Sequence, residues 1–235
     1  MLKRFRIFIL GLLASGVALA GCSGGHQARS VDLRPDAILV NPDIYVKGGD
    51  GQMLHRYADK TVDINRYKNV IIDPVLIYKQ DELDKGRLEN YQKLANNAFV
   101  YLNEEFSKQL KVVKEPEPGT MRIQMAIIDV KRSAPVRMVL SSATPIGLGL
   151  GAVKFAATGK QTGVGEVTAE IRATDAMTGQ LLAAGYDRRV GNKQLEGLYD
   201  TWSDADRALQ YWAKKGSYFI CHLKGGKDCV PPGNL

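Results

Sequence analysis

The chain has 235 residues, of which 45% are hydrophobic and 24% charged, and its formal net charge is +7. These values are ordinary for a globular protein with one domain, or with one domain and a tail. The positive charge is mild, and no segment interleaves a block of Lys and Arg with aromatic residues, which argues against nucleic acid as a partner.

The first 21 residues have the features of a secretory signal peptide. A basic start at residues 3–6 precedes an uncharged and mostly apolar run at residues 7–20, which ends in the small residues Ala20 and Gly21. The apolar run is shorter than the roughly 20 residues that a membrane-spanning helix needs. We therefore expect residues 1–21 to be a signal peptide.

The tetrad Leu19-Ala20-Gly21-Cys22 resembles the lipobox of bacterial lipoproteins. This resemblance implies cleavage before Cys22 and lipidation of its sulfur and its new amine, and Ser23 in the next position implies sorting to the outer membrane. Two or three acyl chains give stable membrane anchoring. Two alternatives are an ordinary signal peptide with a free cysteine and a serine-nucleophile motif at residues 21–25, which cleavage would destroy.

The first half of the mature chain predicts a tether, a strand and a long helix. Residues 22–34 are small and polar, as in a tether. Residues 67–78 are rich in β-branched side chains and predict a buried strand that bulges or lies at an edge at Pro74. Apolar residues recur at every third or fourth position over residues 82–110, which predicts an amphipathic helix.

The second half predicts a hairpin and a second helix. Further strands are expected at residues 111–114, 121–131, 166–174 and 180–188, and a last helix at about 201–215. Strict alternation places Val167, Ala169, Ile171 and Ala173 inward and Glu166, Thr168, Glu170 and Arg172 outward. This order predicts an α+β fold in residues 35–216, a two-layer sandwich whose mainly antiparallel sheet is packed by one long and one shorter helix.

Residues 144–165 form a glycine-rich segment without acidic residues. It matches neither the P-loop nor the G-x-G-x-x-G motif. Three interpretations remain: a loop that covers the sheet, an apolar loop that contacts a partner or a membrane, and a membrane-inserting hairpin. The residues of a partner-binding loop would be Ile146, Leu148, Leu150 and Phe155, and the nearby lysines argue against insertion.

Two further cysteines, Cys221 and Cys229, lie in a C-terminal tail expected at residues 217–235. A compartment outside the cytoplasm permits disulfides, and the two glycines between these cysteines allow the chain to turn back. We therefore expect a Cys221–Cys229 disulfide. The alternative is a metal site with His222 as a third ligand, for which the spacing is unusual.

Four segments, in chain order and behind a lipobox, carry a family resemblance: YKNVIIDPV, PGTMRIQMAIIDV, TPIGLG and DAMTGQLLAAGYDRR. They resemble a family of proteobacterial lipoproteins known as domain of unknown function 3313. The resemblance covers about residues 33–215 and implies a compact domain of the cell envelope. It implies no catalytic residue, metal ligand or cofactor.

No local sequence motif identifies a set of catalytic residues. Its three histidines are dispersed, and it has no H-E-x-x-H motif. Paired carboxylates for glycoside hydrolysis are available in number, but no spacing selects a pair. Asp73 and Asp129 are candidates, and capping or turn formation is the alternative role for both.

These observations favour a binding protein over an enzyme. We expect a lipid-anchored outer-membrane lipoprotein whose domain faces the periplasm and binds another envelope protein or a cell-wall component, without cofactor or metal. The alternative is a periplasmic hydrolase that acts on cell-envelope material. A deep pocket of converging polar groups would favour the hydrolase, and an exposed apolar surface would favour the binding module.

Overall fold

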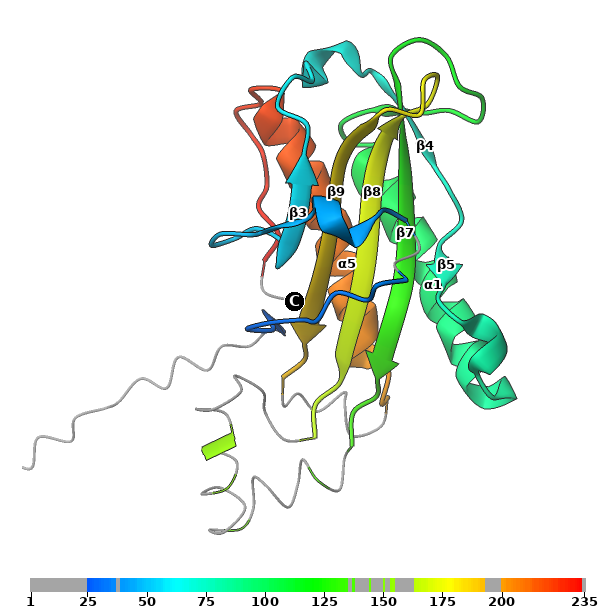
Figure 1. The fold of residues 1–235 in the computed structure, drawn as a ribbon, viewed down its shortest axis with the longest axis vertical. Helices are drawn as coiled ribbons and strands as arrows, with labels where there is room; N and C mark the ends of the chain where they lie inside the picture. The colour runs from blue at the N-terminus through cyan, green and yellow to red at the C-terminus, as the bar shows by residue number, and fades with distance from the viewer. Residues whose placement is uncertain are drawn as a thin grey trace, which may run out of the picture.

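The computed structural model describes residues 25–36, 39–134, 163–192 and 200–233, together with residues 137, 144, 150, 153 and 154. Within these residues, one mixed sheet of nine strands is packed on one face by two helices (Figure 1). The strands are β1 (His26–Gln27), β2 (Val46–Lys47), β3 (His55–Ala58), β4 (Asn69–Ile72), β5 (Leu76–Ile77), β6 (Lys111–Val112), β7 (Thr120–Lys131), β8 (Glu166–Asp175) and β9 (Leu181–Val190). The helices are α1 (Lys85–Phe106) and α5 (Ser203–Leu223). The predicted α+β fold is confirmed, although the two helices have similar lengths of 22 and 21 residues.

The long strands β7, β8 and β9 form an antiparallel centre, and the order across the sheet is β2-β3-β9-β8-β7-β4-β6. In addition, β1 pairs with β9 and β5 pairs with β7. The short strands β4 and β5 both run parallel to β7, one after the other. The predicted hairpin is confirmed as β8 and β9, joined by a turn with Gly179 at a positive φ of 74°.

Pro74 interrupts the strand predicted at residues 67–78. The chain forms β4 up to Ile72 and resumes as β5 at Leu76, so the expected irregularity at Pro74 is confirmed. Proline has no N–H to donate to a strand partner, which explains the break at this position.

Helix α1 starts later than predicted because its start is set by a cap. The Asp84 carboxylate accepts a hydrogen bond from the Arg87 N–H at 3.0 Å, which satisfies one of the free donors of the first turn. The buried side of α1 carries the apolar residues of the predicted periodicity, including Tyr91, Leu94 and Leu102. Helix α5 continues eight residues beyond its expected end at residue 215, to Leu223.

The face of the sheet opposite the helices is covered, contrary to expectation. Thr168 and Glu170 of β8, expected outward, are only 1% and 0% exposed. The N-terminal segment crosses this face (Figure 1) and packs Val31 and Leu39 against Tyr186 of β9. Strict alternation identified the two faces correctly, but it did not show that a distant segment covers the second one.

Glu170 fixes this N-terminal segment to the sheet. Its carboxylate accepts hydrogen bonds from the Leu39 N–H at 3.1 Å, the Val40 N–H at 3.3 Å and the Tyr45 hydroxyl at 2.9 Å. Buried charges require this kind of hydrogen bonding to be tolerated. The segment assigned to a tether at residues 22–34 is therefore docked over much of its length, with Ala28 and Val31 only 4% and 6% exposed.

Candidate functional site

A groove with apolar walls lies on the helix side of the sheet, between the C-terminal half of α5 and the strands β3, β8 and β9. We call it the apolar groove, and its volume is about 610 Å³. Among its lining residues are Ala58, Ile64, Met121, Ile171, Ala173, Ala183, Gly216, Phe219 and Leu223. Residues 59, 60 and 62–65 also line it.

Small residues create the floor of the apolar groove. Ala58, Ala183 and Ala173 lie opposite one another on β3, β9 and β8, so they form one row across three neighbouring strands. Short side chains along this row leave space that Leu or Phe would fill. On the helix that faces the row, a Cβ at Gly216 would meet the Phe106 ring at 2.7 Å, so this glycine lets the ring approach α5.

The rim of the apolar groove exposes large apolar side chains. Phe219 and Leu223 are four residues apart on α5 and are 37% and 61% exposed. Residues at this spacing lie on the same side of a helix. Leaving such side chains in water is unfavourable, and together they form an exposed apolar surface beside the hollow.

The mouth of the apolar groove carries Asp59, Lys60 and Asp63. The Asp59 carboxylate accepts hydrogen bonds from the Thr61 N–H and hydroxyl and from Gln180, and the Thr61 bonds in particular lower its pKa. Asp63 accepts a hydrogen bond from the Asn65 N–H at 2.9 Å. Both acids are thus occupied in shaping the local turns.

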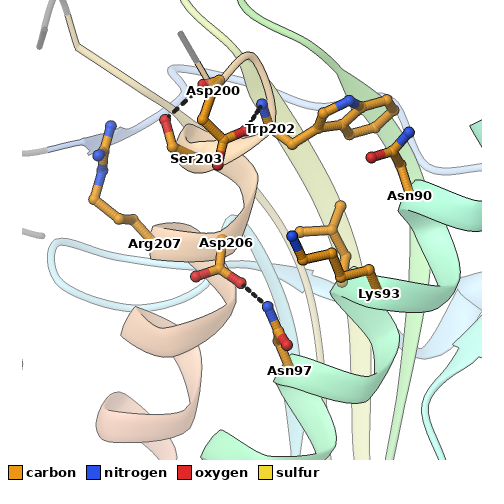
Figure 2. Close-up of a pocket in the computed structure, with 9 residues that line it drawn as sticks. Asn90, Lys93, Asn97, Asp200, Trp202, Ser203, Asp206 and Arg207 are labelled. Carbon is orange, nitrogen blue, oxygen red and sulfur yellow. Dashed lines mark hydrogen bonds between the residues drawn. The ribbon is translucent and has the colours of Figure 1, made fainter. Parts of the chain in front are cut away.

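A second, polar hollow of about 350 Å³ lies between α1 and the start of α5 (Figure 2). Its polar lining residues are Asn90, Lys93, Asn97, Asp200, Ser203, Asp206 and Arg207, and Trp202 lies beside them. Asp206 accepts hydrogen bonds from the Asn97 amide at 2.7 Å and the Tyr101 hydroxyl at 2.8 Å. Burial and the contact with Asp206 raise the pKa of Tyr101 to about 12. This hollow is therefore built around contacts that join the two helices.

Two further acids are buried at the helix–sheet interface. Asp187 is 2% exposed and accepts hydrogen bonds from the Trp212 indole at 2.9 Å and the Gln27 amide at 2.6 Å. Its pKa is raised by burial, which these hydrogen bonds partly oppose. Asp204 is 4% exposed and accepts from the Ser133 hydroxyl and the Gly165 N–H, each at 2.7 Å. No local motif around either residue indicated these roles.

A family described as "Protein of unknown function (DUF3313)" matches residues 44–215. The chain belongs to the DUF3313 family. The matched region includes the strands that form the floor of the apolar groove, whereas the rim residues Phe219 and Leu223 follow it. A comparison with curated proteins gives no match.

Two solved structures are similar to this chain at low identity. The PelC dodecamer from Paraburkholderia phytofirmans is 10% identical, with 74% of this chain and 96% of that chain covered and a TM-score of 0.38. A DUF4136 family protein from Bacteroides thetaiotaomicron is 12% identical, with 77% and 98% covered and a TM-score of 0.34.

The residues that the sequence singled out are dispersed in this DUF3313 protein. Cys22, Ile146, Leu148 and Phe155 lie outside the described residues, and Leu150 is described and is 68% exposed. Asp73 forms an ion pair with Arg122 at 2.7 Å, and Asp129 lies at an irregularity in the pairing of β7 with β8. Of the described residues among them, Leu150, Asp73 and Asp129 do not line the apolar groove, which is formed by residues from distant parts of the chain.

The expected disulfide is present, with 5.7 Å between the Cα atoms of Cys221 and Cys229. His222 stacks on the Tyr218 ring instead of completing a metal site. Within the described ranges, no group of three or more His, Cys, Asp or Glu side chains is arranged to hold a metal ion. A search of the same residues for a helix long and apolar enough to cross a membrane finds none.

Proposed function

We propose that this DUF3313 protein is a lipid-anchored outer-membrane lipoprotein whose domain faces the periplasm and binds an acyl chain of envelope lipid in the apolar groove. The anchor is supported by the tetrad Leu19-Ala20-Gly21-Cys22 directly after an apolar run. Lipidation of Cys22 with two or three acyl chains gives the stable attachment that one chain does not.

The apolar groove is the observation that carries the binding role. Its volume of about 610 Å³ lies within the range of roughly 300–1,000 Å³ that is typical of small-molecule sites. The floor and rim of the groove offer hydrophobic contacts and few hydrogen-bonding groups. The floor residues are Ala58, Ala173 and Ala183, and the rim residues are Phe219 and Leu223. A flexible hydrocarbon chain is the ligand class that such a surface favours.

The polar hollow does not support the hydrolase alternative equally well. Hydrolysis with two carboxylates needs one to reach the substrate as an acid or base and one to act as nucleophile or to activate water. In Figure 2, Asp206 points toward Asn97 of α1, and its second oxygen accepts from Tyr101. Asp200 is engaged with the start of α5 through the Trp202 N–H at 2.9 Å. Structural roles account for both acids.

Displacement of a fluorescent fatty acid by palmitate tests the binding role. Ala58 is exposed and lies in the floor of the apolar groove, so Ala58→Trp fills the hollow at a site that tolerates a large side chain. Leu223→Glu places a charge at the rim. We expect either variant to weaken binding by about tenfold or more, because a hydrocarbon chain loses contacts or meets a charge.

The matched control is Leu76→Glu, because Leu76 is 44% exposed on β5 and does not line the groove. This variant should bind the fluorescent fatty acid as the parent does. If palmitate fails to displace the probe from the parent, or if all three variants bind equally well, the apolar groove is not an acyl-chain site.

A further inference from the structure

The anchor and the folded domain are separated by very little chain. Strand β1 begins at His26, four residues after Cys22. Four residues span at most about 14 Å even when fully extended. If Cys22 is lipidated as proposed, this short connection holds one particular part of the domain against the membrane.

Strand pairing locates the point where the chain enters the sheet. His26 lies opposite Val190 of β9, Val190 lies opposite Glu166 of β8, and Glu166 lies opposite Lys131 of β7. These four residues form one row across the sheet, at the end where β7 and β9 finish and β8 begins. Because β1 is antiparallel to β9, β1 starts at this same end, with His26 as its first residue. We call this end the anchored end.

The entry point is fixed by hydrogen bonds. Gln27 donates to Asp187 at 2.6 Å and to the Gln52 carbonyl at 2.8 Å. The next residue, Ala28, donates its N–H to the Arg188 carbonyl at 2.9 Å. These bonds prevent the segment after His26 from acting as additional tether, so the four-residue separation sets the distance between the anchor and the domain.

The anchored end carries exposed basic side chains. Lys131 and Arg132 at the end of β7 are exposed, and so is Lys154 in the connection from β7 to β8. The same connection exposes Leu150 and Val153, at 68% and 69%. Lysine and arginine near apolar side chains are typical of surfaces that contact anionic lipid headgroups.

Acids near this end offset part of its positive charge. Glu166 is paired with Lys131 at 3.7 Å, and its side chain is 15% exposed. Asp200 is exposed just before α5. The acids Asp81, Glu82 and Asp84 follow β5, which pairs with β7 on the side away from β8 and β1.

We propose that the anchored end lies on the lipid headgroups, with Lys131, Arg132 and Lys154 toward an anionic phospholipid surface. The apolar groove then lies at the end of the domain far from the bilayer that holds the anchor. Met121 lines the groove at the far end of β7, ten residues from Lys131, and ten strand residues span roughly 33 Å. The groove thus receives its ligand from the periplasmic side.

The first experiment measures the orientation of the lipidated full-length protein in vesicles that contain phosphatidylglycerol. The variants Lys154→Cys and Met177→Cys each add one cysteine. Because Cys22 is acylated and Cys221 is paired with Cys229, a fluorophore reacts with the introduced thiol only. Met177 is 57% exposed in the turn between β8 and β9, at the end opposite the anchor. We expect quenching by headgroup-labelled lipid to be at least about threefold stronger at position 154. Equal quenching at both positions would overturn the proposal while leaving the anchor intact.

The second experiment removes the anchor, so that the two proposals fail separately. The Cys22→Ser chain is co-sedimented with anionic and with neutral vesicles, and Lys131→Glu/Arg132→Glu is compared with Lys111→Glu/Lys114→Glu at the opposite end. Each basic residue near an anionic surface contributes roughly fivefold to the affinity, so the first double variant should bind anionic vesicles about 25-fold or more weakly, and the second should bind like the parent. Equal loss in both double variants, or equal binding to both kinds of vesicle, refutes a specific headgroup surface. Mass measurement of the N-terminal peptide tests the acylation of Cys22 independently.

Discussion

Replacement of the buried Asp204 should destabilise the domain, and a neighbouring glycine allows the effect to be dissected. Its carboxylate joins the start of α5 to the sheet through Ser133 and Gly165, and it forms an ion pair with Arg207 at 2.6 Å. A Cβ at Gly191, which follows β9, would overlap the Asp204 carboxyl carbon. The glycine and the aspartate are therefore complementary, and either change should be felt through the other.

The expected magnitudes follow from these contacts. Asp204→Ala leaves the Ser133 hydroxyl and the Gly165 N–H without their acceptor in a buried site, and breaking a buried charged network of this kind costs about 3 kcal/mol. Because Arg207 keeps 22% of its side chain exposed, water compensates part of the loss on that side. For a chain of this size, such a loss lowers Tm by about 6–12 °C. Gly191→Ala alone should cost about 2 kcal/mol through overpacking.

A double-mutant cycle measured by urea unfolding separates steric complementarity from general fragility. In the Asp204→Ala background the Cβ at position 191 has room, so Gly191→Ala should cost less than about 0.5 kcal/mol, which gives a coupling of about 1.5 kcal/mol or more. Asp81→Ala is the control, because Asp81 is exposed, and it should change the free energy of unfolding by less than about 0.5 kcal/mol. Additive effects of the two changes would show that Gly191 and Asp204 do not fit together as described.

Three further predictions concern the anchor, acid stability and the disulfide. Cys22→Ser should leave the protein soluble or as an uncleaved precursor, and continued fractionation with the outer membrane would mean that Cys22 is not the anchor or that another surface suffices for attachment. Burial alone would raise the pKa of Asp175, but hydrogen bonds from the Thr178 and Met177 backbone and from the Tyr67 hydroxyl outweigh it and lower the pKa to about 2. The folded-state pKa of Asp175 is thus below its unfolded value, so the ionised carboxylate contributes about 2 kcal/mol of stability above pH 4 that is lost as the pH falls toward 2. Asp175→Asn should flatten the decline in unfolding free energy over that range. An unchanged decline of the unfolding free energy in acid would refute this role. Cys221→Ser/Cys229→Ser should lower the free energy of unfolding by roughly 2–3 kcal/mol, and two alkylatable thiols in protein taken from the periplasm would contradict the disulfide itself.

The secondary structure was largely predictable because its signals are local. Periodicity located α1 and the hairpin, and Pro74 broke its strand where a residue without an N–H must. The start of α1 differed by three residues because capping by Asp84 sets it. The extension of α5 to Leu223 lacked a comparable signal before Gly225, which adopts a positive φ of 75° after the helix.

The candidate site was not predictable because it depends on pairing between distant residues. Ala58, Ala173 and Ala183 are individually unremarkable, and only the register of β3, β9 and β8 brings them into one row. The same limit applies to Glu170. Alternation placed Glu170 on the face of the sheet opposite to that of Ala169. An irregular segment more than 120 residues earlier supplies the Leu39 N–H and the Tyr45 hydroxyl that make the burial of Glu170 possible.

The apolar groove exists because small residues line the sheet there, although helix α5 extends alongside them. The same helix α5 that fills one half of the sheet face with Leu209 and Trp212, which are 1% and 2% exposed, continues past the alanine row and presents Gly216 and then Phe219. Larger side chains on the three strands would close the hollow and bury Phe219 and Leu223, which would gain about 25 cal/mol for each Å² of apolar surface removed from water. The chain forgoes that stabilisation at this end of the sheet. Burial of the proposed apolar ligand against the same surface would recover that stabilisation, which supports the choice of this groove as the binding site.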